Sequence, residues 1–313
     1  MDGIILVDKP QKFTSHDLVK TIRKILNTRK VGHFGTLDPM ATGLMINAVG
    51  KATKLFSFFS KADKVYQGGI RFGYATDTYD SFGKPVSSEQ KNYPDKIKLL
   101  ETIKSFTGEI NQVPPPYSAK KYKGRPLYKY ARDKKEIRLK SNKLFIHYFR
   151  LINYTPPLLK FEVKCSSGTY IRSLAHDLGR DLKCGAHLSV LSRLEIGNFH
   201  LKKCFTIQEI KKLFEEGKMT KFLIPLESLL PEFPKIILDN AGAILAKNGN
   251  PISHHYILKV FNQDNTSSCF TFEKEKTFRM FTVEGKLIAF ARQSPEKNHF
   301  HPFLVINSEN DKK

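Results

Sequence analysis

A short segment near the N-terminus, residues 32–44, combines residue types that could form a catalytic loop. It holds three glycines, Pro39 and a single carboxylate, Asp38. Glycine and proline at this density predict a tightly turned loop. Because Asp38 directly precedes Pro39, its backbone is restricted to extended conformations and its side chain projects from a stiff segment. Such a carboxylate can act as a nucleophile or a base, or it can cap the turn.

A second segment with candidate functional residues follows the turn at residues 166–169. These residues are Tyr170 and Arg172. The turn lies between a strand-like run and a segment with helical periodicity, so both side chains are expected near a helix N-terminus, where anions are stabilised. An arginine within about 4–6 Å of a carboxylate lowers the pKa of that acid by about 1–3 units. Arg172 is therefore either the partner of an acid or a surface residue, and Tyr170 is a candidate substrate contact.

A third segment, residues 114–140, interleaves cations with tyrosines. Three prolines open it, and residues 118–140 hold ten Lys and Arg against two acids. Lysine and arginine side chains bind backbone phosphates, and tyrosines stack on unpaired bases. The pattern therefore favours binding of single-stranded or looped RNA. A solvated basic loop is the alternative. The residues expected to meet RNA are Lys120, Lys121, Lys123 and Arg125.

The overall charge supports a polyanionic partner. The chain of 313 residues holds 52 Lys and Arg against 30 Asp and Glu, a net charge of +22. Residues 234–313 contribute only +3, which leaves +19 for residues 1–233. A globular protein this basic is typical of nucleic-acid binding, although a generally basic surface would give the same balance.

The cysteines and the N-terminus exclude several classes of protein. The four cysteines are far apart and form no Cys-x-x-Cys pair, which argues against a disulfide framework. Cys184 and His187 have a ligand-like spacing, but no second pair completes a site, so we expect no metal. The N-terminus lacks the features of a signal peptide, and no apolar run approaches about 18 residues. We therefore expect a cytoplasmic protein without a membrane anchor.

Periodicity predicts that helices and strands interleave without a regular βαβ repeat, which indicates an α+β fold with a mixed, mainly antiparallel sheet flanked by helices. The strands are expected over residues 3–7, 44–49, 66–74, 144–152 and 159–165. The helices are expected after Thr14 or Ser15 and over residues 51–60, 97–106, 169–182 and 207–216.

The C-terminal part differs in pattern from the rest. Three prolines in residues 225–234 suggest a domain boundary. Residues 236–246 read as one helix, and short strands are expected near 256–261, 278–283, 287–291 and 303–306. Such short strands predict a small β-rich barrel, followed by a frayed tail over residues 307–313.

Four sequence blocks resemble the signature blocks of the TruB family of tRNA pseudouridine synthases. The resemblance runs from about residue 4 to residue 230, and the part beyond it is similar to a PUA RNA-binding domain. It implies a catalytic domain over residues 1–230, with the basic insert at about 114–140, and a PUA-like domain over residues 231–313. The blocks are Gly32–Pro39, Lys64–Tyr66, Ser167–Arg172 and Cys184–Leu188.

The resemblance also implies roles for individual residues. Asp38 corresponds to the aspartate that attacks the target uridine, so that the base can detach, rotate and rejoin through C5 without a cofactor. Tyr66 matches a tyrosine that stacks on the flipped uracil, and Arg172 matches the arginine that pairs with the aspartate. His33 matches a histidine that fills the space left by the nucleotide, and Leu191 an apolar residue around the base. Ordinary alternatives are a core aromatic for Tyr66, core packing for Leu191 and a backbone hydrogen bond for His33.

The function implied is isomerisation of uridine 55 in the T loop of tRNA by a monomer that needs no protein partner. A guide-RNA-dependent pseudouridine synthase is the nearest alternative, because it would share the catalytic blocks and the PUA domain. The basic insert and the lack of sizeable terminal extensions favour direct tRNA recognition. A non-catalytic RNA chaperone is the other alternative, but it would not need Asp38, Tyr66 and Arg172 together.

Overall fold

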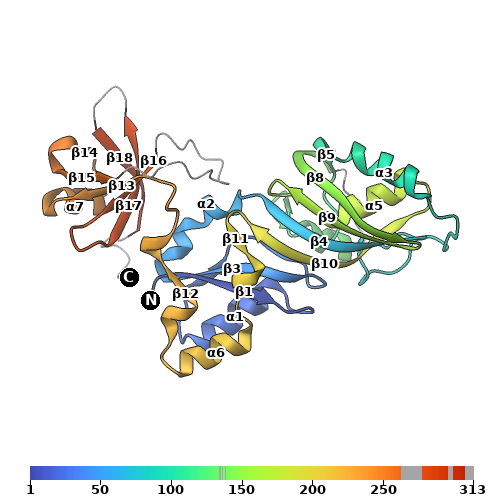
Figure 1. The fold of residues 1–313 in the computed structure, drawn as a ribbon, viewed down its shortest axis with the longest axis horizontal. Coiled ribbons are helices and arrows are strands. Elements are labelled where there is room, and N and C mark those ends of the chain that lie inside the picture. The colour runs from blue at the N-terminus through green and yellow to red at the C-terminus, as the bar shows by residue number, and fades with distance from the viewer. Residues whose placement is uncertain (134, 136, 138, 262–276, 295–298, 307–313) are drawn as a thin grey trace.

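The computed structural model describes residues 1–133, 135, 137, 139–261, 277–294 and 299–306. Within these residues the chain forms a ten-stranded sheet, a six-stranded sheet and a two-stranded ribbon, with helices packed against the two large sheets (Figure 1). The predicted α+β fold is confirmed. The expected tail at residues 307–313 lies outside the described residues.

The ten-stranded sheet builds the N-terminal part of the molecule. Its strand order is β12-β1-β3-β10-β4-β9-β8-β5, with β2 beside β3 and β11 beside β10. Among the described strands of this sheet only β3 and β10 pair in parallel, so the expected mixed, mainly antiparallel sheet is confirmed. The strands are β1 (Gly3–Lys9), β2 (Val31–His33), β3 (Thr42–Val49), β4 (Lys64–Phe72), β5 (Gly108–Gln112), β8 (Asn142–Thr155), β9 (Leu158–Cys165), β10 (Ala186–Ile196), β11 (Phe199–His200) and β12 (Leu223–Pro225).

The apolar run of β3 is continuous because both faces of this strand are buried. Met45 and Val49 face one hydrophobic cluster with helix α1 (Ser15–Ile25), whereas Leu44 and Ile46 face a second cluster on the other side. Period-2 alternation therefore divides one strand between two cores.

The described helices are α1 (Ser15–Ile25), α2 (Phe56–Ser60), α3 (Lys96–Ser105), α4 (Leu127–Arg132), α5 (Ile171–Asp181), α6 (Ile207–Glu215) and α7 (Asn240–Lys247).

The helix α1 begins where the sequence predicts. The Thr14 hydroxyl accepts a hydrogen bond from the Asp17 backbone N–H, and the Asp17 carboxylate accepts one from the Thr14 N–H. This capping box satisfies two N–H groups that the helix leaves unpaired. The buried residues Leu18, Val19 and Ile22 then hold α1 against the sheet.

Strand β10, which occupies the middle of the large sheet, has no counterpart among the predicted strands. Its register with β4 shifts twice, between Leu188 and Val190 and between Arg193 and Glu195. These irregularities interrupt the alternation of inward and outward residues. Arg193 is 1% exposed and Val190 is 55% exposed, the reverse of the usual preference, so periodicity alone does not reveal the strand.

The prediction of one helix over residues 236–246 is wrong. Residues Lys235–Leu238 form strand β13, and α7 starts only after Asp239, whose carboxylate accepts a hydrogen bond from Gly242 N–H. A short apolar run leads directly into a capped helix, so the two elements read as one. The second sheet has the order β14-β18-β17-β16-β13-β15 and includes β14 (Ile252–Ser253), β15 (Ile257–Phe261), β16 (Thr277–Phe281), β17 (Leu287–Ser294) and β18 (His299–Val305).

The connection between the sheets is packed. The Arg279 guanidinium is buried and donates to the carbonyls of Glu227, Leu229, Pro231 and Phe233. Phe58 of α2 reaches across, and its ring centroid lies 4.7 Å from that of Phe290. The proline-rich segment therefore joins two parts that share one hydrophobic cluster.

Two expectations concern membranes and metals. None of the helices in the described part of the chain is long and apolar enough to span a membrane. The same residues contain no group of three or more His, Cys, Asp or Glu side chains that could hold a metal ion.

Removing the Phe58 ring should destabilise the protein strongly. Phe58→Ala leaves a cavity between α2 and the C-terminal sheet, so the free energy of unfolding should fall by about 3–5 kcal/mol. Phe56→Ala is the matched control on the same helix, because its side chain is 53% exposed, and should cost less than about 1 kcal/mol. Urea denaturation measures both values. Equal losses would contradict the shared core.

Candidate active site

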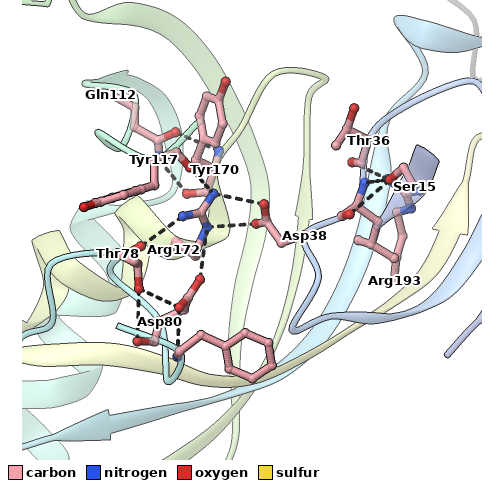
Figure 2. Close-up of polar contacts among 12 residues, drawn as sticks. Ser15, Thr36, Asp38, Thr78, Asp80, Gln112, Tyr117, Tyr170, Arg172 and Arg193 are labelled. Carbon is pink, nitrogen blue, oxygen red and sulfur yellow. Dashed lines mark hydrogen bonds and ion pairs between the residues drawn. The ribbon is translucent and has the colours of Figure 1, made fainter. Parts of the chain in front are cut away.

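The carboxylate of Asp38 meets the guanidinium of Arg172 in a bidentate ion pair (Figure 2). Arg172 Nε donates to Asp38 Oδ2 at 2.8 Å, and Nη2 donates to Oδ1 at 2.9 Å. The Asp38 side chain is 32% exposed, whereas the Arg172 side chain is 5% exposed. Two parallel charge-assisted bonds fix the plane of the carboxylate. The buried guanidinium therefore holds the carboxylate in a fixed orientation at the protein surface.

Three further groups surround the guanidinium. Nη1 donates to the Thr78 carbonyl at 2.9 Å, and Nη2 donates to the Tyr117 carbonyl at 3.0 Å. The Asp80 carboxylate lies 3.6 Å from Nε and is 8% exposed (Figure 2). Asp80 is itself held by the Thr78 hydroxyl at 2.6 Å and by the Phe82 N–H at 3.0 Å. Arg172 is thus enclosed by groups that accept its hydrogen bonds or balance its charge.

The loop that carries Asp38 is fixed on both sides by buried polar side chains. Ser15 Oγ donates to the Leu37 carbonyl at 3.1 Å and accepts from the Leu37 N–H at 2.9 Å. Arg193 donates to the carbonyls of Gly35 and Thr36 on one side of the loop and to that of Leu44 beyond it. Within the described residues, the hydrogen bonds of the Asp38 carboxylate come from Arg172 alone. The carboxylate does not cap the turn.

A buried lysine, Lys9, stabilises the turn that packs against the Asp38 loop. Lys9 Nζ donates to the carbonyls of Pro10 and Phe13, and Lys12 N–H in this turn donates to the Pro39 carbonyl at 2.8 Å. Burial lowers the pKa of Lys9 to about 8, while the negative charge of Asp38 opposes that shift. The turn after β1 and the loop after β2 therefore hold each other in place.

Arg172 comes from the first turn of α5, as the sequence predicts. Tyr170 is the N-cap residue, and the Gln112 side chain holds both of its backbone groups, accepting from Tyr170 N–H and donating to its carbonyl. Burial raises the pKa of the Tyr170 phenol. The end of β5 therefore fixes the start of the helix that delivers the guanidinium.

Tyr66 and Leu191 lie on neighbouring strands, β4 and β10, and both are buried at 7% and 6% exposure. Both belong to the hydrophobic cluster that contains Leu37 and Met40 of the Asp38 loop. Burial raises the pKa of the Tyr66 phenol, and the positive charge of Arg193 opposes the shift. The two side chains are thus core residues that also flank the loop. Their position is compatible with both the packing role and the functional role expected of them.

His33 ends β2, directly opposite Asn47 in register. Burial lowers the pKa of His33, and the charges of Arg193 and His16 lower it further. Its Nδ1 atom is buried and has no hydrogen-bond partner among the described residues. The alternative in which this nitrogen bonds the loop backbone is therefore not observed, and the lowered pKa favours the neutral form of the imidazole.

The basic segment starts at the active site, since Tyr117 already contacts Arg172. Lys120 Nζ binds Asn142 Oδ1 at 2.8 Å, and Arg125 pairs with Asp133 and lies over the Tyr130 ring. Lys121 and Lys123 are exposed, and Lys123 lies over the Tyr122 ring. The cations and tyrosines therefore form one folded surface around β6 (Lys121–Tyr122), β7 (Arg125–Pro126) and α4.

Sequence reasoning missed Asp80, Thr78 and Arg193. The segment 76–83 reads as a turn, and an aspartate in a turn has so many ordinary roles that it gives no signal by itself. An arginine between the leucines of β10 is a stronger signal, because a buried cation needs several acceptors. Only the folded chain shows which carbonyls those are.

Known proteins with similar sequences identify the family. The model of the N-terminal domain of TruB family pseudouridylate synthases matches residues 23–171, and the model of the tRNA pseudouridylate synthase B C-terminal domain matches residues 172–231. The chain belongs to the TruB family. A tRNA pseudouridine synthase B from Solibacter usitatus is 40% identical over 98% of this chain and 100% of its own length. One from Caldanaerobacter subterraneus is 42% identical over 82% of this chain and 88% of its own length.

Solved structures extend the likeness of fold to the C-terminal sheet. A chain from a crystal structure of a Cbf5-Nop10-Gar1 complex is 25% identical, with a TM-score of 0.70 over 98% of this TruB-family chain and 86% of that chain. A chain from an archaeal box H/ACA sRNP Nop10-Cbf5 complex has a TM-score of 0.69 over 98% of this chain and 87% of its own. Because the match covers nearly the whole chain, both sheets recur in these proteins.

Neutralising Asp80 should slow the reaction without unfolding the site. Asp80→Asn keeps an oxygen for Thr78 and Phe82 but removes the negative charge beside Arg172, so kcat should fall about 10–100-fold, equivalent to about 1.4–2.7 kcal/mol. Asp77→Asn is the matched control in the same turn, because its oxygen can still accept from Lys84 N–H. Steady-state kinetics on a tRNA transcript measures both. Equal kcat values for the two variants would contradict this role of Asp80.

Proposed function

We propose that this protein isomerises uridine 55 in the T loop of tRNA, with Asp38 as the nucleophile. Members of the TruB family convert uridine in tRNA to pseudouridine, and this chain belongs to that family. The observation that carries the finer assignment is the bidentate pair, which holds a partly exposed carboxylate in a fixed orientation. A carboxylate held this way forms a covalent bond to the nucleoside without a cofactor.

The bonds of the proposed reaction balance within the nucleoside. Asp38 adds to the uridine, the bond between N1 and C1′ breaks, and the uracil turns until C5 faces the sugar. The bond between C5 and C1′ then forms, the proton on C5 is removed while N1 takes up a proton, and Asp38 leaves as a carboxylate. No atom is gained or lost, as an isomerisation requires.

The surrounding residues fit the handling of a flipped base. Reaching the glycosidic bond requires the nucleotide to leave its stack, which costs a few kcal/mol. His33 is a flat ring at the start of the loop whose lowered pKa favours the neutral form, suited to the vacated position. Tyr66 offers a ring whose burial keeps the phenol protonated, and Leu191 offers apolar contact on the neighbouring strand.

The basic segment and the C-terminal sheet are the proposed RNA-binding parts. Residues Lys120, Lys121, Lys123 and Arg125 begin three residues after Tyr117, so RNA bound to them lies next to the ion pair. The C-terminal part, residues 231–313, is the proposed PUA-like domain, and its small net charge of +2 assigns it a lesser electrostatic share. We propose that the protein acts as a monomer and without a protein partner.

Replacing the proposed nucleophile should abolish turnover while binding persists. Asp38→Asn keeps the shape of the side chain and an oxygen for Arg172, so the fold and the affinity for tRNA should change little, whereas pseudouridine formation should fall at least about 10⁴-fold. Pseudouridine mapping of an unmodified tRNA transcript measures position and yield together. Substantial product from the variant would reject Asp38 as the nucleophile.

The same assay separates direct recognition from guidance by a second RNA. Purified protein and the transcript alone should give pseudouridine at position 55. Product that appears only after another RNA is added would favour a guide-dependent enzyme, and binding without product by the wild-type protein would favour a chaperone.

Removing the charge of the basic segment should weaken binding in a salt-dependent way. Replacing Lys120, Lys121, Lys123 and Arg125 by Ala should lower tRNA affinity and flatten the plot of log affinity against log salt by about 0.7–0.9 for each phosphate that is no longer neutralised. The matched control replaces four exposed lysines at or beyond α6, Lys211, Lys212, Lys218 and Lys221. Fluorescence anisotropy at several salt concentrations measures both slopes. Equal slopes for the two variants would move the RNA surface elsewhere.

A further inference from the structure

An aromatic pair outside the reacting groups joins the turn at residues 76–83 to helix α5. The rings of Tyr79 and His176 stack with their centroids 3.7 Å apart and their planes at 11°. Both side chains are half-buried, and burial lowers the pKa of His176, with Arg180 acting in the same direction. His176 Nδ1 is buried and has no hydrogen-bond partner among the described residues. The imidazole is therefore placed for its flat contact with the phenol ring.

The backbone of Tyr79 is in a conformation that a bulky residue rarely adopts. Its φ is 66°, in the left-handed region. The Tyr79 N–H donates to the Thr76 carbonyl, and the Tyr79 carbonyl accepts from Leu188 N–H of β10. A strained residue persists only where the surrounding structure holds it, and such residues gather at functional sites.

This conformation places both neighbours of Tyr79 on the same guanidinium. The Thr78 carbonyl accepts from Arg172 Nη1 at 2.9 Å, and the Asp80 carboxylate lies 3.6 Å from Nε. The residue between them binds β10 through its carbonyl and stacks its ring on His176 of α5. If the ring were released, both contacts to Arg172 could relax together.

The helix supplies both halves of this arrangement. His176 is four residues after Arg172, about one turn, so the two side chains leave neighbouring positions on one face of α5. One rigid helix thus presents the guanidinium and, a turn later, the ring against which Tyr79 stacks. That contact adds to the backbone hydrogen bonds that tie the turn to Leu188 of β10.

We propose that Tyr79 and His176 are positioning residues, whose stack holds the turn on α5 and so keeps Arg172 aligned with Asp38. This proposal rests on the proposed function of the Asp38 site. It predicts an effect on turnover and none on RNA binding, because neither ring is assigned a substrate contact.

Paired substitutions at each position test the stack. Tyr79→Gly suits the left-handed backbone but removes the ring, and should lower kcat at least about tenfold with KM and tRNA affinity within about twofold of wild type. Tyr79→Phe keeps the ring and should match wild type. His176→Ala should behave like Tyr79→Gly, and His176→Phe should restore most of the activity. Thermal melting confirms that each variant is folded, and the His176 pair carries the test if Tyr79→Gly does not fold.

The double variant Tyr79→Gly with His176→Ala decides whether the two rings act as a unit. Its kcat should be no lower than that of either single variant, since each change already removes the same contact. Independent losses that multiply, an unchanged kcat in Tyr79→Gly, or a raised KM with unchanged kcat would each overturn the proposal. The Asp38→Asn assay is separate, so a failed nucleophile and a failed stack give different results.

Discussion

The guanidinium of Arg172 carries a full positive charge at a position that is only 4% exposed. Taking an ion out of water is costly unless its charge and its hydrogen bonds are compensated, and removing one partner of a buried pair typically costs about 3–5 kcal/mol. Two carboxylates and two carbonyls compensate it here. Each segment that supplies one of these carboxylates or carbonyls is therefore held close to the Arg172 guanidinium. Much of the fold serves to bring those segments together.

The two carboxylates beside Arg172, Asp38 and Asp80, have different surroundings, and this difference suits them to different roles. Asp80 is 8% exposed, and its oxygens are occupied by Thr78 and Phe82 as well as by the neighbouring charge. Asp38 is 32% exposed, and within the described residues its carboxylate accepts hydrogen bonds only from Arg172. One acid can therefore meet a substrate while the other stays a fixed counter-charge. Helix α1 and the large sheet support this division by burying Ser15 and Arg193 against the loop backbone.

The parts of the site that lie in local sequence patterns were predictable. Glycine and proline spacing predicts the Asp38 loop, and the turn before α5 predicts the place of Arg172, because both depend on residues close in the chain. The pairing itself joins residues 134 positions apart, and only the family resemblance indicated it. The role of Asp80 was missed for a similar reason, since a turn aspartate has no pattern that reveals a distant arginine.

Among the elements of the fold, the strongly periodic helices and strands matched their expected ranges. Strand β10 was missed because its bulges and its buried Arg193 break the alternation, and residues 236–246 were misread because β13 passes directly into the capped helix α7. In both places tertiary pairing decides the structure. Hydrogen bonds to β4 and β3 make β10 a strand, and pairing with β15 and β16 does the same for β13.

The central claim is that a bidentate guanidinium, and not merely a positive charge, holds the Asp38 carboxylate for reaction. Single-turnover kinetics of Arg172→Lys on a tRNA transcript tests it most directly, because lysine keeps the charge but cannot form two parallel bonds to one carboxylate. The account predicts a rate constant for pseudouridine formation at least about 100-fold below wild type, with tRNA affinity unchanged. A rate within a few-fold of wild type in the folded variant would contradict it.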